Sequence, residues 1–376
     1  METTRKRGFA MTRLKVGIIG LGEVAQTVHL PILQMLSDKY EISALCDISV
    51  KLLEKLGEQF RVANLYTDAV ELTKQEDLDV VFVLNSDEYH TDCVVAAAEN
   101  KKHILVEKPM CLTMADADKI IEARDKNGVQ VMVGYMRRFA PAFLEGVKEI
   151  EKMDKIKYAK VRDIIGPNIM MIEQSHNVHR FSDIPQSAME DRWRRAASMV
   201  QEAIGDAPDE IKNAYRLLCG LSSHDLSAMR ELIGFPKRVV SAVQWNGGGY
   251  INAIFEHDGF YTAFETGVDQ QRRFDAHLEV FSDTKQVKIQ YNTPYIRQLP
   301  TTLSVKETIG EAFEERELRP TFKDAYVAEL EYFYDVVTQG KTPKTTPEDF
   351  KEDLKLFNMI VEKMLESHNL VKEESI

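Results

Sequence analysis

The sequence has 376 residues, of which 44% are hydrophobic and 29% are charged, the ordinary composition of a folded globular protein. At this length one hydrophobic core usually divides, so two domains are expected. The formal net charge of −12 opposes contact with a phosphate backbone, so we expect no nucleic-acid partner. No apolar stretch of membrane-spanning length and no signal peptide is visible, which predicts a cytoplasmic protein without membrane contact.

The four cysteines lack the paired spacing of a zinc site or of a disulfide framework; they are Cys46, Cys93, Cys111 and Cys219. This usage is typical of a reducing compartment. Residues 1–12 are polar and basic and precede the first patterned segment, so they are expected to be a disordered tail outside the fold.

Residues 13–134 alternate short apolar runs with amphipathic segments, which is the pattern of βαβ units around a buried parallel sheet. A capping-box spacing, Thr113 with Asp116, marks the start of one predicted helix. Six strands joined by helical crossovers predict a Rossmann domain with a doubly wound parallel sheet. The predicted strands are 14–20, 41–46, 63–67, 79–85, 103–107 and 129–134.

Residues 135–376 follow a different pattern and are predicted to form a second α/β domain. Its largely antiparallel open sheet is predicted from five alternating segments separated by turn signals. The predicted fold class is therefore α/β, with the Rossmann domain first. The five segments are 237–246, 249–257, 259–268, 275–282 and 285–291; helices are expected at 142–157, 198–217, 323–339 and 347–368, the last two able to pack back on the Rossmann domain.

The first predicted strand runs directly into the glycine-rich sequence GLGEVA and then into an amphipathic stretch. This strand, turn and helix context is the one that a dinucleotide-binding fingerprint requires. Gly20 permits the tight turn, Gly22 lets backbone approach a pyrophosphate, and Ala25 allows close packing of helix against strand. A glycine turn without a ligand is the alternative. The expected cofactor contacts are Gly20, Leu21, Gly22, Glu23 and Val24.

Asp47 ends the second predicted strand, where a carboxylate can accept hydrogen bonds from both hydroxyls of an adenosine ribose. The same carboxylate repels the 2′-phosphate of NADP, so NAD is the expected cofactor. Lys51 lies nearby in the sequence and could offset part of that repulsion. A helix-capping role for Asp47 is the alternative.

The fifth predicted strand ends in Glu107-Lys108-Pro109, and with the fingerprint upstream the sequence resembles the Gfo/Idh/MocA oxidoreductases, the family of glucose-fructose oxidoreductase and inositol dehydrogenase. The resemblance covers nearly the whole chain. It implies a Rossmann domain followed by a domain whose open sheet carries the substrate site on one face and homodimer or homotetramer contacts on the other. Further matching segments are Asn85-Ser86 with His90, GYMRRFAP at 134–141, Trp193-Arg194, His224-Asp225-Leu226 and GKTPKTTPED at 340–349.

Chemistry gives two of these residues catalytic roles. Lys108, at the carboxyl end of a parallel strand, is expected at the ligand crevice, where its ammonium can stabilise a substrate oxygen. Glu107 is placed to orient it. His224 begins a helical pattern and is the expected general base, because a histidine titrates near neutrality. The alternatives are a surface ion pair for Lys108 and a structural role for His224, with Asp225 capping the helix.

The resemblance also implies contacts with cofactor and substrate beyond this pair. Tyr135 and Arg138 follow the sixth predicted strand, which should deliver them to the same crevice. The further cofactor contacts expected are Asn85, Ser86, His90, Glu107, Lys108 and Arg138, and the substrate contacts are Tyr135, Lys108, Arg194, His224 and Asp225.

The sequence departs from its family at two places, which predicts a remodelled pocket. Many members carry an aspartate four residues before the histidine, where this chain has Gly220, and the helical segment 198–217 replaces a short glycine-rich connection. The preceding basic residues are each either a substrate contact or part of a solvated face. They are His176, His179, Arg180, Arg192, Arg194 and Arg195. The pair His176 and His179 lacks a completing carboxylate or cysteine, so no metal is expected.

These observations predict an NAD-dependent oxidoreductase that transfers hydride from a secondary alcohol of a sugar, polyol or glycoside. One alternative is a lyase or hydrolase that oxidises its sugar only transiently, without net reduction of the cofactor. Another, of a different class, is a nicotinamide-binding sensor or scaffold that has lost catalysis, which the glycine at position 220 makes admissible.

Overall fold

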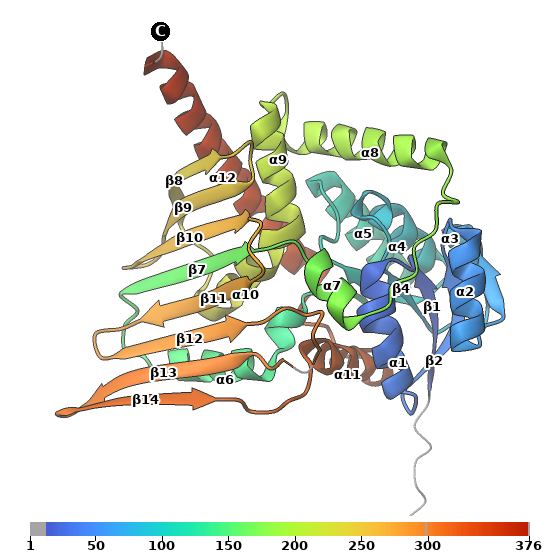
Figure 1. The fold of residues 1–376 in the computed structure, drawn as a ribbon, viewed down its shortest axis with the longest axis horizontal. Coiled ribbons are helices and arrows are strands. Elements are labelled where there is room, and N and C mark those ends of the chain that lie inside the picture. Colours follow the sequence, from blue (N-terminus) through green and yellow to red (C-terminus); the bar gives the residue numbers. More distant parts are fainter. Residues whose placement is uncertain (1–12, 298, 375–376) are drawn as a thin grey trace, which may run out of the picture.

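The computed structural model describes residues 13–297 and 299–374, so the predicted tail at 1–12 lies outside the described residues. The first part of the chain forms a six-stranded parallel sheet in the order β3-β2-β1-β4-β5-β6 (Figure 1). All six predicted strands are present, and the doubly wound fold is confirmed. Their bounds are β1 Leu14–Ile19, β2 Tyr40–Cys46, β3 Asn64–Tyr66, β4 Val80–Val83, β5 His103–Glu107 and β6 Val131–Gly134.

Short helices connect these strands, as the crossover pattern predicts. The capping box is confirmed at α5, where Thr113 Oγ1 accepts a hydrogen bond from the backbone N–H of Asp116 at 3.0 Å. The helices are η1 Ala25–His29, α1 Leu30–Met35, α2 Val50–Phe60, α3 Ala69–Thr73, η2 Asp87–Tyr89, α4 His90–Glu99 and α5 Met114–Asn127.

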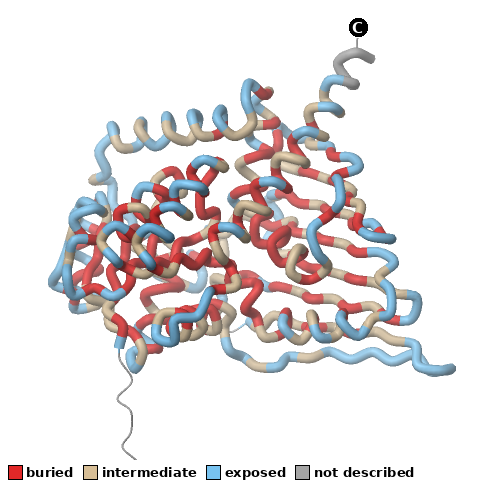
Figure 2. Tube along the Cα trace, turned by 180° about the vertical axis from the view of Figure 1, so that it is seen from behind, coloured by how far each residue is buried: buried red, intermediate tan, exposed pale blue. Residues whose placement is uncertain are grey.

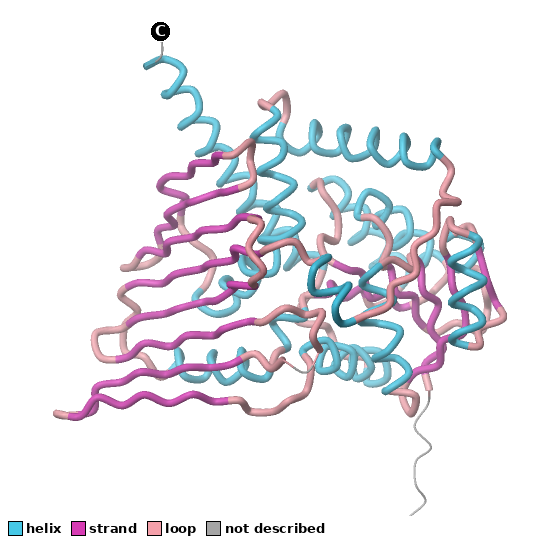
Figure 3. The backbone as a smooth tube through the Cα atoms, in the orientation of Figure 1, coloured by secondary structure: helices cyan, strands magenta, loops and turns pink. Residues whose placement is uncertain are grey.

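The second sheet has eight strands in the order β14-β13-β12-β11-β7-β10-β9-β8 and is largely antiparallel, with β7 and β10 parallel. Its strands form the broad magenta layer in Figure 3. The five predicted strands are confirmed. Three more, β7, β13 and β14, were not predicted. The bounds are β7 Tyr158–Ile165, β8 Arg238–Trp245, β9 Tyr250–Glu256, β10 Tyr261–Val268, β11 Phe274–Phe281, β12 Lys285–Tyr291, β13 Thr302–Ile309 and β14 Ala312–Leu318.

Helices cover one face of this second sheet and leave the other face open (Figure 1). The predicted helix at 142–157 ends earlier than expected, because the chain turns after Glu151 to enter β7. The segment at 198–217 is two helices, α8 and α9. The bounds are η3 Met136–Phe139, α6 Pro141–Glu151, α7 Ile169–Ser175, α8 Gln186–Ile204, α9 Asp209–Leu217, η4 Leu218–Ser222, α10 Ser223–Ile233, α11 Ala325–Gln339 and α12 Pro347–Glu374.

The C-terminal helices join the two sheets. On α11, the Leu330 carbonyl accepts a hydrogen bond from the Tyr40 hydroxyl at 2.7 Å, and the Phe333 ring packs edge-on against Phe82 of β4 at 5.8 Å between centroids. Helix α12 packs against both α5 and β8. Within the described ranges, no helix combines the length and apolar character needed to span a bilayer.

Candidate active site

The glycine-rich loop lies at the carboxyl end of β1, beside the end of β4. Gly20 has φ +91°, and a Cβ there would come within 2.4 Å of the backbone nitrogen of Asn85, so only glycine fits. Gly22 is the opposite case, since no described heavy atom lies within 4 Å of the position of its missing Cβ. The open space beside Gly22 fits a pyrophosphate approaching the backbone at the start of a helix.

Asp47 connects this loop to the next crossover. Its Oδ2 accepts a hydrogen bond from the N–H of Leu21 at 2.8 Å, and its Oδ1 accepts one from Ser49 at 2.9 Å. The residue that caps α2 is Ser49, whose Oγ accepts from the N–H of Leu52 at 3.2 Å. Asp47 is therefore not the N-cap of α2; its carboxylate lies beside the glycine-rich loop, at the end of β2.

The ends of β4 and β5 are tied together by His90. One ring nitrogen of His90 lies 3.0 Å from the Asn85 carbonyl, and the other lies 2.9 Å from the Pro109 carbonyl. The Asn85 side chain donates to Cys93 Sγ at 3.4 Å, while its buried Oδ1 has no partner among the described residues. That oxygen is free to accept a hydrogen bond from a ligand in the cleft. Ser86, one residue further, precedes η2 and does not line the cleft.

Lys108 points from the end of β5 toward η4. Its ammonium donates to the Gly220 carbonyl at 2.5 Å. Glu107 contacts the backbone of Lys108 and not its ammonium: Oε2 accepts from the Lys108 N–H at 3.2 Å, and Oε1 bonds the ring of His29 at 2.8 Å. Burial lowers the pKa of Lys108, although the Glu107 carboxylate acts in the opposite direction.

His224 faces the same cleft from the first turn of α10. Burial holds the pKa of His224 well below its ordinary value, and the positive charges of Lys108 and Arg137 act in the same direction. The ring is therefore neutral at neutral pH and can take up a proton. Its Nδ1 is buried and has no hydrogen-bond partner in the part of the chain that the structure describes.

These residues surround a cleft of about 310 Å³ between the two sheets. Its floor comes from the strand ends of the first sheet, and its opposite wall comes from η4, α10 and the second sheet. The lining side chains include Val24, Asn85, His90, Glu107, Lys108, Arg137, Arg192, Arg216, Gly220, His224, Phe274 and Tyr295.

Comparison with known proteins relates the first part of the chain to a described family. Residues 14–135 match the family described as "Oxidoreductase family, NAD-binding Rossmann fold" (GFO_IDH_MocA). Residues 14–135 thus match the NAD-binding Rossmann part of the Gfo/Idh/MocA oxidoreductases. The chain is 26% identical to the myo-inositol 2-dehydrogenase of Thermotoga maritima over 96% of this chain and 99% of that protein. It is also 34% identical to the inositol 2-dehydrogenase of Salmonella typhimurium, over 35% of this chain and 40% of that protein.

Solved structures show the same fold over nearly the full length. Levoglucosan dehydrogenase in complex with NADH and levoglucosan superposes with a TM-score of 0.72 at 17% identity, covering 94% of this chain and 98% of that chain. The myo-inositol 2-dehydrogenase from Lactobacillus plantarum gives a TM-score of 0.69 at 18% identity, covering 95% and 98%. The α/β architecture predicted from the sequence is thus also the fold of these two solved structures.

Asp225 does not line the cleft, contrary to its expected role in substrate binding. It is fully buried and forms an ion pair with Arg137, whose guanidinium also lies 3.1 Å from Asp163 on β7. Burial raises the pKa of Asp225 well above its ordinary value, against the opposing effect of Arg137. Arg137 itself lines the cleft, a position that was not predicted from the sequence.

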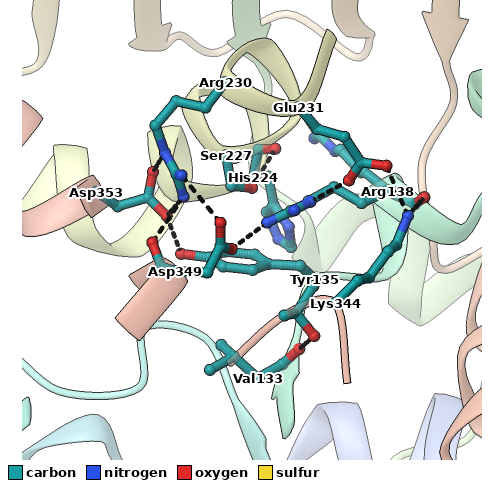
Figure 4. A network of polar contacts seen from close by, with 12 residues as sticks. Val133, Tyr135, Arg138, His224, Ser227, Arg230, Glu231, Lys344, Asp349 and Asp353 are labelled. Carbon is teal, nitrogen blue, oxygen red and sulfur yellow. Dashed lines mark hydrogen bonds and ion pairs between the residues drawn. The ribbon is translucent and has the colours of Figure 1, made fainter. Parts of the chain in front are cut away.

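Tyr135 and Arg138 also lie elsewhere than expected (Figure 4). The Tyr135 hydroxyl donates to Asp353 of α12 at 2.5 Å, and the ring is buried. Arg138 pairs with Glu231 at 2.5 Å and with Asp349. Arg138 therefore links α10 to α12, whereas Tyr135 bonds α12 alone, and neither residue lines the cleft.

The basic run before η4 has mixed positions. Arg194 is largely exposed on α8 and pairs with Asp191, so its expected substrate contact is not supported by its placement. Arg192 lines the cleft, as does Arg216 of α9, which pairs with Asp87 and Glu88. Among the described residues, no group of three or more His, Cys, Asp or Glu side chains is arranged to hold a metal ion.

Gly220 is the position at which the family resemblance led us to expect an aspartate. It lies in η4 and lines the cleft, and no described heavy atom lies within 4 Å of where its Cβ would be. A side chain at this position would thus extend into open space. The space remains empty of side chains, and the Gly220 backbone carbonyl instead accepts the hydrogen bond from Lys108.

Proposed function

We propose that this protein is an NAD-dependent dehydrogenase that oxidises a secondary alcohol of a sugar, polyol or glycoside. The observation that carries the proposal is the convergence of Lys108 and His224 on one cleft at the carboxyl edge of the first sheet. The names of the relatives, which are dehydrogenases of inositols and of levoglucosan, support a polyhydroxylated substrate.

NAD, when bound, would accept the hydride that leaves the alcohol carbon. The residues proposed to hold it are those of the glycine-rich loop with Asp47 and, at the nicotinamide end, Asn85 and His90. Gly22 leaves room for the pyrophosphate, and Asn85 Oδ1 offers an unused acceptor. Glu107 is proposed to act indirectly, because it fixes the backbone from which the Lys108 side chain extends.

The protein's own residues would manage the substrate's oxygen and proton. The Lys108 ammonium has three N–H donors and uses one on Gly220, so two remain for the substrate hydroxyl. As the alcohol loses its proton, this positive charge stabilises the developing negative charge on the oxygen. The neutral ring of His224 takes the proton. The Arg137 charge disfavours a second positive charge beside Lys108 and thus keeps the base neutral before reaction.

The proposal is tested by following reduced cofactor while the purified protein turns over a panel of polyols, sugars and glycosides with NAD. Turnover with at least one of them, and its loss in Lys108→Met, is the expected result. A product that forms without net cofactor reduction would indicate transient oxidation. NAD binding with no product of either kind across a broad panel would contradict the proposal and favour a sensor.

We also propose that the chain works in the cytoplasm as a homodimer or homotetramer, with a domain boundary at residues 134 and 135. Four buried free cysteines are consistent with a reducing compartment. The open face of the second sheet exposes large apolar side chains, among them Val243, Trp245 and Tyr261, that a second copy would cover. Light scattering coupled to size exclusion measures the oligomeric state.

A further inference from the structure

The segment between α7 and α8, residues 176–185, runs from the second sheet across the glycine-rich loop to the start of α2 (Figure 1). We call it the strap. At one end, the ring of His176 bonds the Tyr295 carbonyl at 2.7 Å. In the middle, the backbone of His179 forms two hydrogen bonds with the Gln26 side chain, at 2.8 and 3.1 Å. The strap therefore lies beside the glycine-rich loop, because Gln26 also donates to the Leu21 carbonyl and Arg180 pairs with Glu23.

Asp183 is the strap residue that reaches α2. Its Oδ1 accepts a hydrogen bond from the Ser49 hydroxyl at 2.6 Å, and its Oδ2 accepts one from the backbone N–H of Lys51 at 3.0 Å. These two donors lower the pKa of Asp183, so the carboxylate is ionised at neutral pH. The N-terminus of the eleven-residue helix α2 favours a negative charge, and the Asp183 carboxylate occupies that place. We call it the anion position.

This anion position is next to Asp47, because Ser49 donates to both carboxylates. The Ser49 backbone N–H donates to Asp47, and the Ser49 hydroxyl donates to Asp183. On the proposed function, Asp47 holds the hydroxyls of the adenosine ribose. A phosphate on the 2′ oxygen would then have to use the same donors at the start of α2. Two of them, the Ser49 hydroxyl and the Lys51 N–H, are already taken by a carboxylate. The Lys51 cation, which could otherwise attract such a phosphate, has an anionic neighbour.

We propose that Asp183 is a specificity-determining residue for the cofactor, which excludes the 2′-phosphate of NADP from the N-terminus of α2 and so favours NAD. This inference rests on the proposed use of a nicotinamide cofactor. From the sequence, Asp47 was the one acid expected to discriminate NAD from NADP. Asp183, which lies 136 positions later in the chain, is a second one. Asp183 occupies the phosphate's donors and also repels the phosphate's charge.

The test is the ratio of the dissociation constants for NADP and NAD, measured by calorimetric titration of the full-length protein. In Asp183→Asn the amide oxygen still accepts from the Lys51 N–H, so the charge is removed while the strap keeps a hydrogen bond. In Asp183→Ser the anion position is emptied. Glu190→Gln on α8 is the matched control, because it removes an exposed charge that, among the described residues, accepts a hydrogen bond from Gln186 of the same helix.

We expect Asp183→Asn to lower the NADP dissociation constant on the order of tenfold, the size of the repulsion between two half-solvated charges a few ångströms apart. Asp183→Ser should lower it further, while NAD binding stays within about twofold. Raising the salt concentration should narrow the difference between wild type and Asp183→Asn. Glu190→Gln should match the wild type throughout.

Unchanged ratios in both Asp183 variants would overturn the inference. So would an equal weakening of NAD and NADP in folded variants, because Asp183 would then only hold the strap in place. If the wild type binds neither nucleotide, the proposed function itself fails, which is a different result from binding without dependence on Asp183. Thermal unfolding of each variant establishes that it is folded.

Discussion

Replacing Lys108 by Met gives the sharpest test of the cleft chemistry. The two side chains have similar length, and methionine is apolar, so the substitution removes the ammonium without opening a large cavity. Burial already disfavours the charged form of Lys108, as the lowered pKa indicates. We therefore expect the free energy of unfolding of Lys108→Met to equal or exceed that of the wild type.

The catalytic cost should be large, because one charged donor to the reacting oxygen is lost. Removing a single donor of this kind costs about 2.7–4 kcal/mol in the transition state, which corresponds to a decrease in kcat of roughly 100- to 1,000-fold. NAD affinity should change little, since the glycine-rich loop and Asp47 are untouched. The assay combines steady-state rates on the best substrate with calorimetric NAD binding.

A Lys108→Met variant that retained more than a tenth of the wild-type kcat would refute this reasoning. A loss of activity that came with lost NAD binding or a lower melting temperature would also refute it, because Lys108 would then be structural. Asn127→Met on the far side of α5 is a suitable control, since its side chain bonds only groups away from the cleft.

The other predictions concern protonation and packing. Because burial holds the pKa of His224 well below its ordinary 6.5, the acid limb of kcat/KM against pH should fall only below that value, and a limb at 6.5 or above would contradict the neutral base. Arg137→Met leaves Asp163 and Asp225 buried without their cation and should lower the free energy of unfolding by about 3–5 kcal/mol, measured in urea. The exposed Arg194→Met, by contrast, should change it by less than about 0.5 kcal/mol. Tyr135→Phe should cost about 1–2 kcal/mol of stability for its lost bond to α12 while KM for the alcohol stays the same; a selective rise in KM would return Tyr135 to the substrate site.

Local patterns predicted the first sheet well because its strands are buried on both faces and are short apolar runs. The second sheet was harder. Strand β7 lies in its centre, yet Arg162 points to the open face and the buried Asp163 is paired with Arg137, so the apolar alternation is interrupted. In β14 nearly every residue is exposed (Figure 2), which leaves no burial pattern to recognise.

Some residues of the candidate site could likewise be predicted from local patterns, and others could not. Gly20, Asn85 and Lys108 could be predicted because each follows directly from the end of a parallel strand, where the direction of the chain is known. Arg137 and Arg138 could not be distinguished, because they are adjacent in the four-residue helix η3 and yet pair with different carboxylates. A helix so short carries no periodicity that tells which residue faces the cleft.

Two contacts of the candidate site could not be predicted from the sequence because they are made by backbone groups. The Gly220 carbonyl holds the Lys108 ammonium, and the His179 backbone holds Gln26, but every residue type offers these groups. The residue types at these positions therefore do not predict either contact. The glycine at position 220 suggested a missing function when read as an absent carboxylate. In the structure the same position supplies a neutral acceptor to Lys108, which leaves the ammonium's full positive charge available to the substrate oxygen. The loss of the acid thus changes the charge of the cleft without removing the partner that orients the lysine.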